Sequence, residues 1–178
     1  GYGFLAGKSV GMFLFILGLA AVVSYQLKLY TGTVGFVKVK EIPSLLIVLV
    51  GNILGCFLVS LVAKLDTAMD IQSAAQGVLQ SRLALGWRPC GVQAIGCGIL
   101  VSVAVHFARK GKEMGYWIPL VFAVPLFIHC GFPHCIADAF YYLTAADYIV
   151  EQPQVLWCYL LTVIGNFIGC NIPRIASI

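Results

Sequence analysis

The stretch Gly51-Asn52-Ile53-Leu54-Gly55-Cys56 occurs a second time, in nearly the same form, as Gly165-Asn166-Phe167-Ile168-Gly169-Cys170. Each copy lies inside an apolar run that is long enough to cross a bilayer. Each copy also follows an apolar run with an interruption, at Leu29-Tyr30-Thr31-Gly32 in the first half and Cys130-Gly131-Phe132-Pro133-His134 in the second. The repeated order of a broken helix and a glycine-asparagine motif predicts two structurally related halves.

Composition indicates the solvent of the chain. Of its 178 residues, 61% are hydrophobic and only 10% are charged. Such a chain cannot be packed around one small soluble core, so we expect an all-α integral membrane protein surrounded by lipid. Its length leaves room for about five or six spans of roughly 20 residues and for no separate catalytic domain. One transmembrane domain over residues 1–178 is therefore expected.

Apolar stretches of spanning length predict five membrane helices. They are expected at residues 10–27, 42–63, 90–108, 114–130 and 155–172, with loops at 64–88, 109–113 and 147–153. The first run lacks the flanks of a cleavable signal peptide, so the chain is expected to insert by its own helices. The seven cysteines lie almost entirely within apolar stretches and are expected to be reduced.

Basic residues predict the orientation in the membrane. The net charge of +4 is small and scattered between apolar runs, which excludes a nucleic-acid surface. Counted on alternate sides, one face has Lys38, Lys40, Arg109, Lys110, Lys112 and Arg174, and the other has Lys8, Lys64, Arg82 and Arg88. The face with more basic residues is predicted to be cytoplasmic.

The repeat predicts an inverted-repeat helical bundle with two interrupted helices. Repeat one covers about residues 1–64 and repeat two about 85–178, where an additional helix precedes the broken one. A matching first repeat needs another span before Gly1. Successive three-span units insert with opposite orientation, and such transporters bind substrate at the paired interruptions. Because freed backbone groups are tolerated at membrane depth only where they face protein or a wet cavity, both breaks are expected to line a pathway.

The order of these motifs resembles that of the formate/nitrite transporter family, whose members carry a Leu-Phe-Thr-type break and a Gly-Phe-Glu-His-Ser-x-Ala-Asn stretch. Here residues 29–34 read Leu-Tyr-Thr-Gly-Thr-Val and residues 131–138 read Gly-Phe-Pro-His-Cys-Ile-Ala-Asp. The resemblance implies an aquaporin-like architecture and a homopentamer in a bacterial cytoplasmic membrane. It further implies one pore per protomer for small monovalent anions such as formate, nitrite, hydrosulfide or lactate, and no cofactor.

The resemblance also implies roles for individual residues. His134 becomes the central pore histidine and Thr31 its hydrogen-bonding partner from the other break. Further members of the expected pathway are Phe15 and Phe127 at an outer constriction, Leu19 and Tyr30 at an inner one, Asn166 in the last helix, and Asp138 where the family has asparagine.

Several positions depart from the family pattern. Pro133 replaces the glutamate before the histidine, and Arg82 or Arg88 stands near the place of a lysine that the family often carries. The family's first helix is missing from the sequence, and Pro173-Arg174 is expected to interrupt the final helix early.

An anion in the bilayer core loses solvation worth several kcal/mol, so the pathway must offer positive potential or a proton. His134 can hydrogen-bond an anion or donate a proton to it, since its reference pKa is about 6.5. Apolar rings around it favour a neutral acid over a charged permeant. Small anions and protons are thus the expected partners.

Each of these residues also has an ordinary structural explanation. His134 can be a satisfied core histidine, Thr31 a helix cap, Arg82 a loop charge, and the aromatic and leucine side chains packing residues. Asn52 and Asn166, with their glycines, can serve close helix packing. Asp138 can either hold the histidine ring or lie solvated at a mouth.

Other functions remain open from the sequence. An aquaporin-like channel for neutral solutes also uses two half-broken repeats, but its Asn-Pro-Ala signatures are absent here. A non-transporting membrane scaffold needs the packing glycines and no polar pore residue. His129-Cys130 and His134-Cys135 match no standard metal spacing, and no catalytic motif is present, so neither a metal site nor an enzyme is expected.

Overall fold

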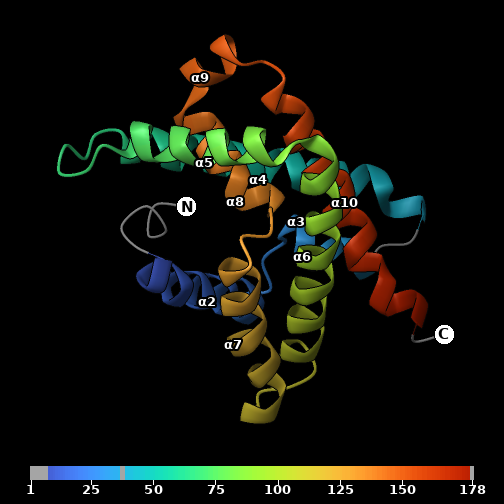
Figure 1. The fold of residues 1–178 in the computed structure, drawn as a ribbon. Helices are drawn as coiled ribbons and strands as arrows, with labels where there is room; N and C mark the ends of the chain where they lie inside the picture. The colour runs from blue at the N-terminus through green and yellow to red at the C-terminus, as the bar shows by residue number, and fades with distance from the viewer. Residues whose placement is uncertain (1–7, 37–38, 177–178) are drawn as a thin grey trace.

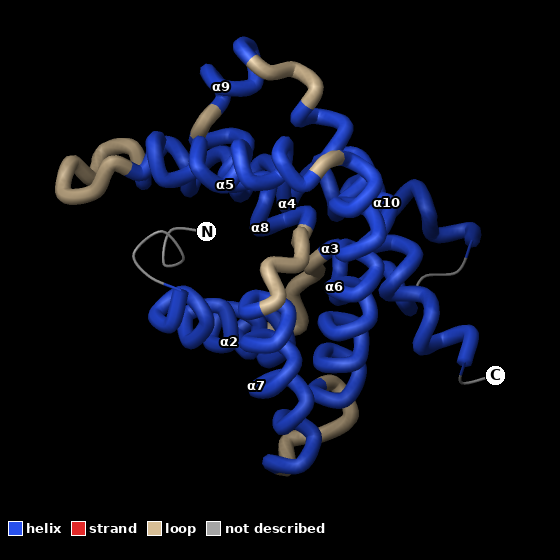
Figure 2. The backbone as a smooth tube through the Cα atoms, in the orientation of Figure 1, coloured by secondary structure: helices blue, strands red, loops and turns tan. Residues whose placement is uncertain are grey.

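The computed structural model describes residues 8–36 and 39–176, and over this part the chain is helical without strands. Figures 1 and 2 show the arrangement of the helices and of the loops between them. The α-helices are α2 Lys8–Ser24, α3 Tyr30–Thr33, α4 Ile42–Ala63, α5 Ile71–Leu85, α6 Trp87–Ala108, α7 Met114–His129, α8 Cys135–Thr144, α9 Ala146–Glu151 and α10 Val155–Ala176. Two short 3-10 helices, η1 Val34–Phe36 and η2 Val39–Glu41, follow α3.

The apolar helices agree with the expected spans. Among the described residues, α4, α6 and the part of α10 from Val155 to Pro173 are long and apolar enough to cross a membrane, whereas α2 and α7 are shorter. Those two shorter helices are the ones that precede the breaks. The all-α membrane fold is therefore confirmed, and α4 has the bounds expected from the sequence.

Two segments expected to be loops contain helices, so these expectations were wrong. Segment 64–88 contains α5, and segment 147–153 overlaps α9. In α5, the buried residues Ile71, Ala75 and Leu79 recur every four positions and pack into a core cluster with Phe140 of α8. Val78 and Leu83 are partly buried beside this stripe, but glutamines and serines alternate with the apolar residues along the helix, so the helical period was a weak signal in the sequence.

The final helix is not interrupted where it was expected to end. Pro173 lies inside α10, which continues to Ala176. A proline removes one backbone donor and bends a helix more often than it ends one when the flanking turns are supported. The expected early interruption was therefore wrong.

Both breaks begin with the same backbone device. After α2, Gln26 N–H bonds to Val23 O at 3.1 Å and Leu27 N–H bonds to Val22 O at 2.9 Å. After α7, Gly131 N–H bonds to Ile128 O and Phe132 N–H to Phe127 O, each at 3.0 Å. These are two Schellman motifs, which place Gln26 at φ 56° and Gly131 at φ 69° in the left-handed region.

The first break thus lies slightly before its expected position. It covers residues 25–29, whereas Thr31 and Gly32 already belong to α3. The second break covers residues 130–134, as expected.

The half-helices that follow the two breaks, α3 and α8, each start at an asparagine side chain that bonds to two backbone groups. We call this arrangement an asparagine clamp. Asn52 Oδ1 accepts a hydrogen bond from Tyr30 N–H at 2.8 Å, while its Nδ2 donates to Lys28 O at 3.1 Å. Asn166 Oδ1 accepts from Cys135 N–H at 2.8 Å, while its Nδ2 donates to Pro133 O at 3.2 Å and to Ala94 O at 2.8 Å. In each half the asparagine holds two backbone groups two residues apart, so the repeated motif in the sequence has a repeated structural purpose.

The glycines of the second copy bring α10 against α6. A Cβ built on Gly165 meets Gly91 O at 2.3 Å, and one on Gly169 meets Ile95 O at 2.1 Å. In the first copy, Gly51 and Gly55 have nothing within 4 Å of a built Cβ. The close packing expected from the small residues is therefore present on α10 and not on α4 among the residues that the structure describes.

Candidate functional site

His134 is the N-terminal cap of α8. Its ring Nδ1 accepts a hydrogen bond from Ala137 N–H at 3.2 Å, which satisfies one of the free amide groups at the helix start. A backbone N–H can only donate, so Nδ1 carries no hydrogen. In the neutral imidazole the single hydrogen must therefore be on Nε2.

Thr31 meets the other side of this ring. Thr31 Oγ1 lies 3.0 Å from His134 Nε2, and both residues are buried, with exposed fractions of 1% and 2%. Because Nε2 donates in this contact, the hydroxyl hydrogen of Thr31 is left to donate elsewhere. The structure thus joins the second break to the start of α3, the half-helix that follows the first break, at one polar pair, although the residues are 103 positions apart.

Phe15 and Phe127 enclose the imidazole. Their ring centroids lie 5.5 and 5.8 Å from that of His134 and 5.3 Å from each other, with Phe127 stacked on the imidazole and Phe15 edge-on. These two aromatic residues, expected as a constriction from the resemblance, lie directly beside the histidine.

Leu19 and Tyr30, expected to form one inner constriction, pack in separate clusters. Leu19 belongs to an apolar cluster with Phe127, Val105 and Val124. Tyr30 packs in another cluster with Val34, Leu45, Cys135 and Cys170. Leu19 follows Phe15 by one helical turn, so the two side chains lie on the same face of α2.

Two cavities border α2 at different points along the helix. One of about 200 Å³ is lined by Arg82, Asp138, Phe127 and His134, and we call it the Arg82 cavity. The other, the Lys28 cavity, has about 880 Å³. On α2, Phe15 lines the first and Val23 the second, which places them about 12 Å apart at 1.5 Å per residue. Leu19, which lies between Phe15 and Val23 on α2, belongs to an apolar cluster with Val124.

The Lys28 cavity is basic. Its lining includes Lys28, Arg109 and Lys112, together with Trp117 and Thr33. The Thr33 hydroxyl is buried and has no hydrogen-bond partner among the described residues. The lining of this cavity therefore combines cationic side chains with the Thr33 hydroxyl, which is a favourable environment for an anion.

A third cavity, of about 490 Å³, lies between α2 and α4 and also reaches His134. Its lining is largely apolar, with Gly51, Gly55 and Leu14 among its residues. The cavity borders α4, whose exposed apolar surface includes Leu46, Ile47, Val50, Leu54 and Leu58.

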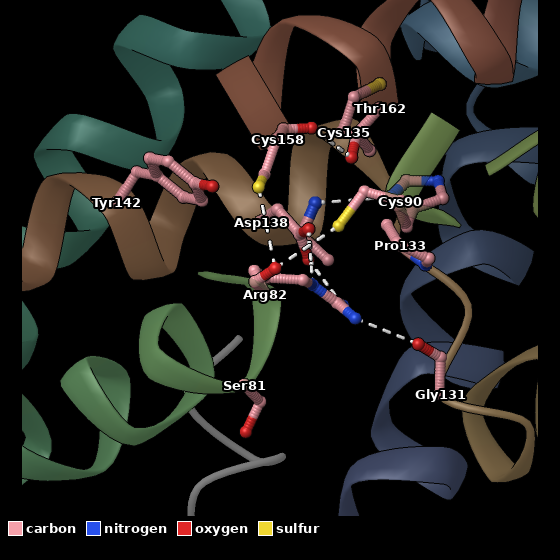
Figure 3. A network of polar contacts seen from close by, with 12 residues as sticks. Ser81, Arg82, Cys90, Gly131, Pro133, Cys135, Asp138, Tyr142, Cys158 and Thr162 are labelled. Atoms are coloured by element: carbon pink, nitrogen blue, oxygen red, sulfur yellow. Dashed lines mark hydrogen bonds and ion pairs between the residues drawn. The ribbon is translucent and has the colours of Figure 1, made fainter. Parts of the chain in front are cut away.

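Asp138 and Arg82 form a buried ion pair, shown in Figure 3. Arg82 Nε donates to Asp138 Oδ2 at 3.0 Å and Nη2 donates to Oδ1 at 3.1 Å. The carboxylate therefore neither holds the His134 ring nor lies solvated, and both interpretations drawn from the sequence were wrong. Arg82 lies on α5 and is not a loop charge.

Asn166 is fully buried, and its side chain bonds to Pro133 O near the end of the second break and to Cys135 N–H at the start of α8. It stands beside the expected pathway as a clamp. Its sequence counterpart Asn52 serves the first break in the same way.

Comparison with known proteins now gives the family. The sequence profile of formate/nitrite transporters matches residues 3–173. The chain belongs to the formate/nitrite transporter family. A solved structure described as a pentameric formate channel with formate bound has a TM-score of 0.78 and 21% identity to this chain, and the match covers 99% of this chain and 83% of that one. At this identity it shows the fold. A search of curated proteins gives no significant match.

Sequence reasoning found the contact between the breaks of this family member but missed two features of the site. The first is the Arg82–Asp138 pair, because α5 was expected to be a loop. The second is the Lys28 cavity, whose basic residues come from two segments that meet only in the fold. The distribution of basic residues between the two membrane faces was a signal for the Lys28 cavity. Lys28 itself lies at the first break, however, and was not assigned to either face.

Proposed function

We propose that this chain conducts small monovalent anions of weak acids, such as formate, nitrite or hydrosulfide, across a membrane. The observation that carries the proposal is the 3.0 Å contact between Thr31 and His134, a buried polar pair built from the second break and from the half-helix that follows the first. Membership of the formate/nitrite transporter family supports it. A non-transporting scaffold has no use for a polar pair of this kind at membrane depth.

The pair supplies donors to an anion. An anion that displaces the contact between the two side chains receives one hydrogen bond from His134 Nε2–H and one from the Thr31 hydroxyl. Phe15 and Phe127 exclude water from this position, which makes each hydrogen bond stronger than it is in water.

The same geometry indicates how a proton is involved. His134 Nδ1 already accepts from Ala137 N–H, so adding a proton there costs that hydrogen bond. The neutral ring is therefore the resting state, and a proton that crosses travels with the permeant as the neutral acid. The apolar cluster between the cavities favours that species, since a bare anion loses several kcal/mol of solvation there.

The Lys28 cavity serves as an anion-collecting mouth in this account. Three cationic residues along its wall raise the local concentration of anions. Lys28 also joins Arg109 and Lys112 on one side of the membrane, which adds to the excess on the face predicted to be cytoplasmic.

A homopentamer with one pathway in each protomer is the proposed assembly, in a bacterial cytoplasmic membrane. The broad exposed apolar surface of α4 supports burial against lipid or other protomers. Within each protomer, residues 1–64 and 85–178 are proposed as the two repeats of a single domain, supported by the matching Schellman motifs and asparagine clamps.

Flux into proteoliposomes tests this function. We expect purified protein to carry formate, nitrite and hydrosulfide faster than protein-free vesicles do, and glycerol no faster. Glycerol flux without anion flux would assign a neutral-solute channel instead. No flux of any solute, from protein that is folded in detergent, would assign the scaffold.

A further inference from the structure

Arg82 contacts both halves of the second broken helix. Its Nε and Nη2 bond to the Asp138 carboxylate in the first turn of α8, and its Nη1 donates to Gly131 O, just after the end of α7, at 2.9 Å. Figure 3 shows the guanidinium between these two partners. One side chain from α5 therefore bridges the loop that carries His134.

The two contacts fit the charges at the break. The C-terminal end of α7 carries a partial negative charge, and a cation there is stabilising, whereas the N-terminal end of α8 prefers an anion such as Asp138. Gly131 O lies just beyond the Schellman motif that ends α7, and it accepts a hydrogen bond from Arg82 Nη1.

Arg82 is itself fixed by its surroundings. Its own carbonyl oxygen accepts hydrogen bonds from Cys90 Sγ at 3.6 Å and Cys158 Sγ at 3.4 Å, which come from α6 and α10. The side chain is 14% exposed and that of Asp138 only 3%. The planar guanidinium holds both carboxylate oxygens and the carbonyl at once, and a lysine ammonium cannot reproduce that geometry.

We propose that Arg82 and Asp138 are positioning residues for the conduction pathway: together they hold the second break in the form that presents His134 to Thr31. Asp138 N–H donates to His134 O at 2.8 Å, so a shift of Asp138 moves the histidine backbone directly. The effect of these residues on transport rests on the proposed function. Their effect on the structure of the second break does not.

The structural part is tested by thiol labelling, which needs no transport. Cys135 is completely buried beside His134, and Cys130 is exposed on the same loop and serves as an internal reference. Site-resolved mass spectrometry would follow a water-soluble maleimide at both thiols. The double variant Arg82→Gln/Asp138→Asn avoids a lone buried charge, and we expect it to elute as wild type and to label Cys135 about tenfold faster, a loss of protection that corresponds to about 1.4 kcal/mol.

Formate flux is measured on the same samples. We expect the double variant to lose about tenfold in flux, Arg82→Lys to be intermediate, and the control Arg88→Gln, at a residue stacked on Trp87 away from the break, to match wild type. Wild-type labelling of Cys135 in the double variant overturns the proposal, whatever the flux. Faster labelling without a change in flux also overturns it, because the Arg82–Asp138 pair then does not position the pathway. Absence of flux in wild type would refute the proposed function, while the labelling still decides whether Arg82 and Asp138 hold the second break in place.

Discussion

At the residue scale, the proposed function depends on how His134 and Thr31 share one hydrogen. His134 donates from Nε2 because its Nδ1 is occupied by Ala137 N–H, and Thr31 therefore accepts and keeps its own hydroxyl hydrogen for the permeant. Both residues were identified by a resemblance between short motifs. The tautomer could not be, because it depends on the position of a backbone amide that only the fold shows.

This sharing predicts that the hydroxyl of Thr31 matters more than its methyl group. Thr31→Val keeps the shape and removes the acceptor, leaving a buried donor unpaired at a cost of about 1–3 kcal/mol, so we expect formate flux to fall at least about tenfold. Thr31→Ser keeps the hydroxyl and should retain most of the flux. Stopped-flow measurements on both variants would contradict the assignment if Thr31→Val conducted like wild type.

Two positive φ values give a second prediction at this scale. Gly131→Ala places a side chain in the left-handed region and should cost about 1–2 kcal/mol, whereas Gln26→Gly removes such strain from the first break. Thermal unfolding in detergent is expected to show a lower midpoint for Gly131→Ala and no loss for Gln26→Gly. Equal destabilisation by both would show that the two breaks are not held by the same backbone motif.

At the element scale, one sequence motif has two environments. The glycines on α10 lie against the α6 backbone, while those on α4 face open space. The sequence predicted the related halves and the apolar helices, because a long apolar run and a repeated motif are local signals. It did not predict α5 or the different surroundings of the two motifs, since a narrow apolar stripe is a weak signal and helix contacts are set by distant residues.

Alanine scanning of the paired glycines tests this difference. A Cβ on Gly165 overlaps Gly91 O, so Gly165→Ala should destabilise by about 1–3 kcal/mol through overpacking. Gly51→Ala meets nothing within 4 Å and should be neutral or slightly stabilising, because alanine is the better helix former. Melting curves with the opposite order would mean that α6 and α10 do not pack in this way.

At the scale of the whole molecule, the proposed pathway runs between two cavities of different charge. One is the basic Lys28 cavity, and the other contains the neutralised Arg82–Asp138 pair. Anion capture should therefore be electrostatic mainly at the Lys28 mouth and should weaken with salt.

Neutralising that mouth gives a prediction about salt. We expect the double variant Lys28→Gln/Lys112→Gln to lose formate flux severalfold at low ionic strength and much less at about 1 M salt, where the Debye length is about 3 Å. The matched control is Lys64→Gln, an exposed lysine just after α4. A loss of flux that did not depend on salt would remove the electrostatic role.

The proposed function requires that a weak acid pass a polar station formed by His134 of the second break and Thr31 at the start of α3. It is tested most directly by formate flux in proteoliposomes from about pH 5 to 8, the range around the histidine reference value, for wild type, His134→Ala, His134→Phe and the exposed control His129→Ala. Wild type and the control are expected to conduct faster as the pH falls, and both His134 variants are expected to lose about tenfold or more in flux at every pH. Wild-type flux in both His134 variants across this range would contradict it.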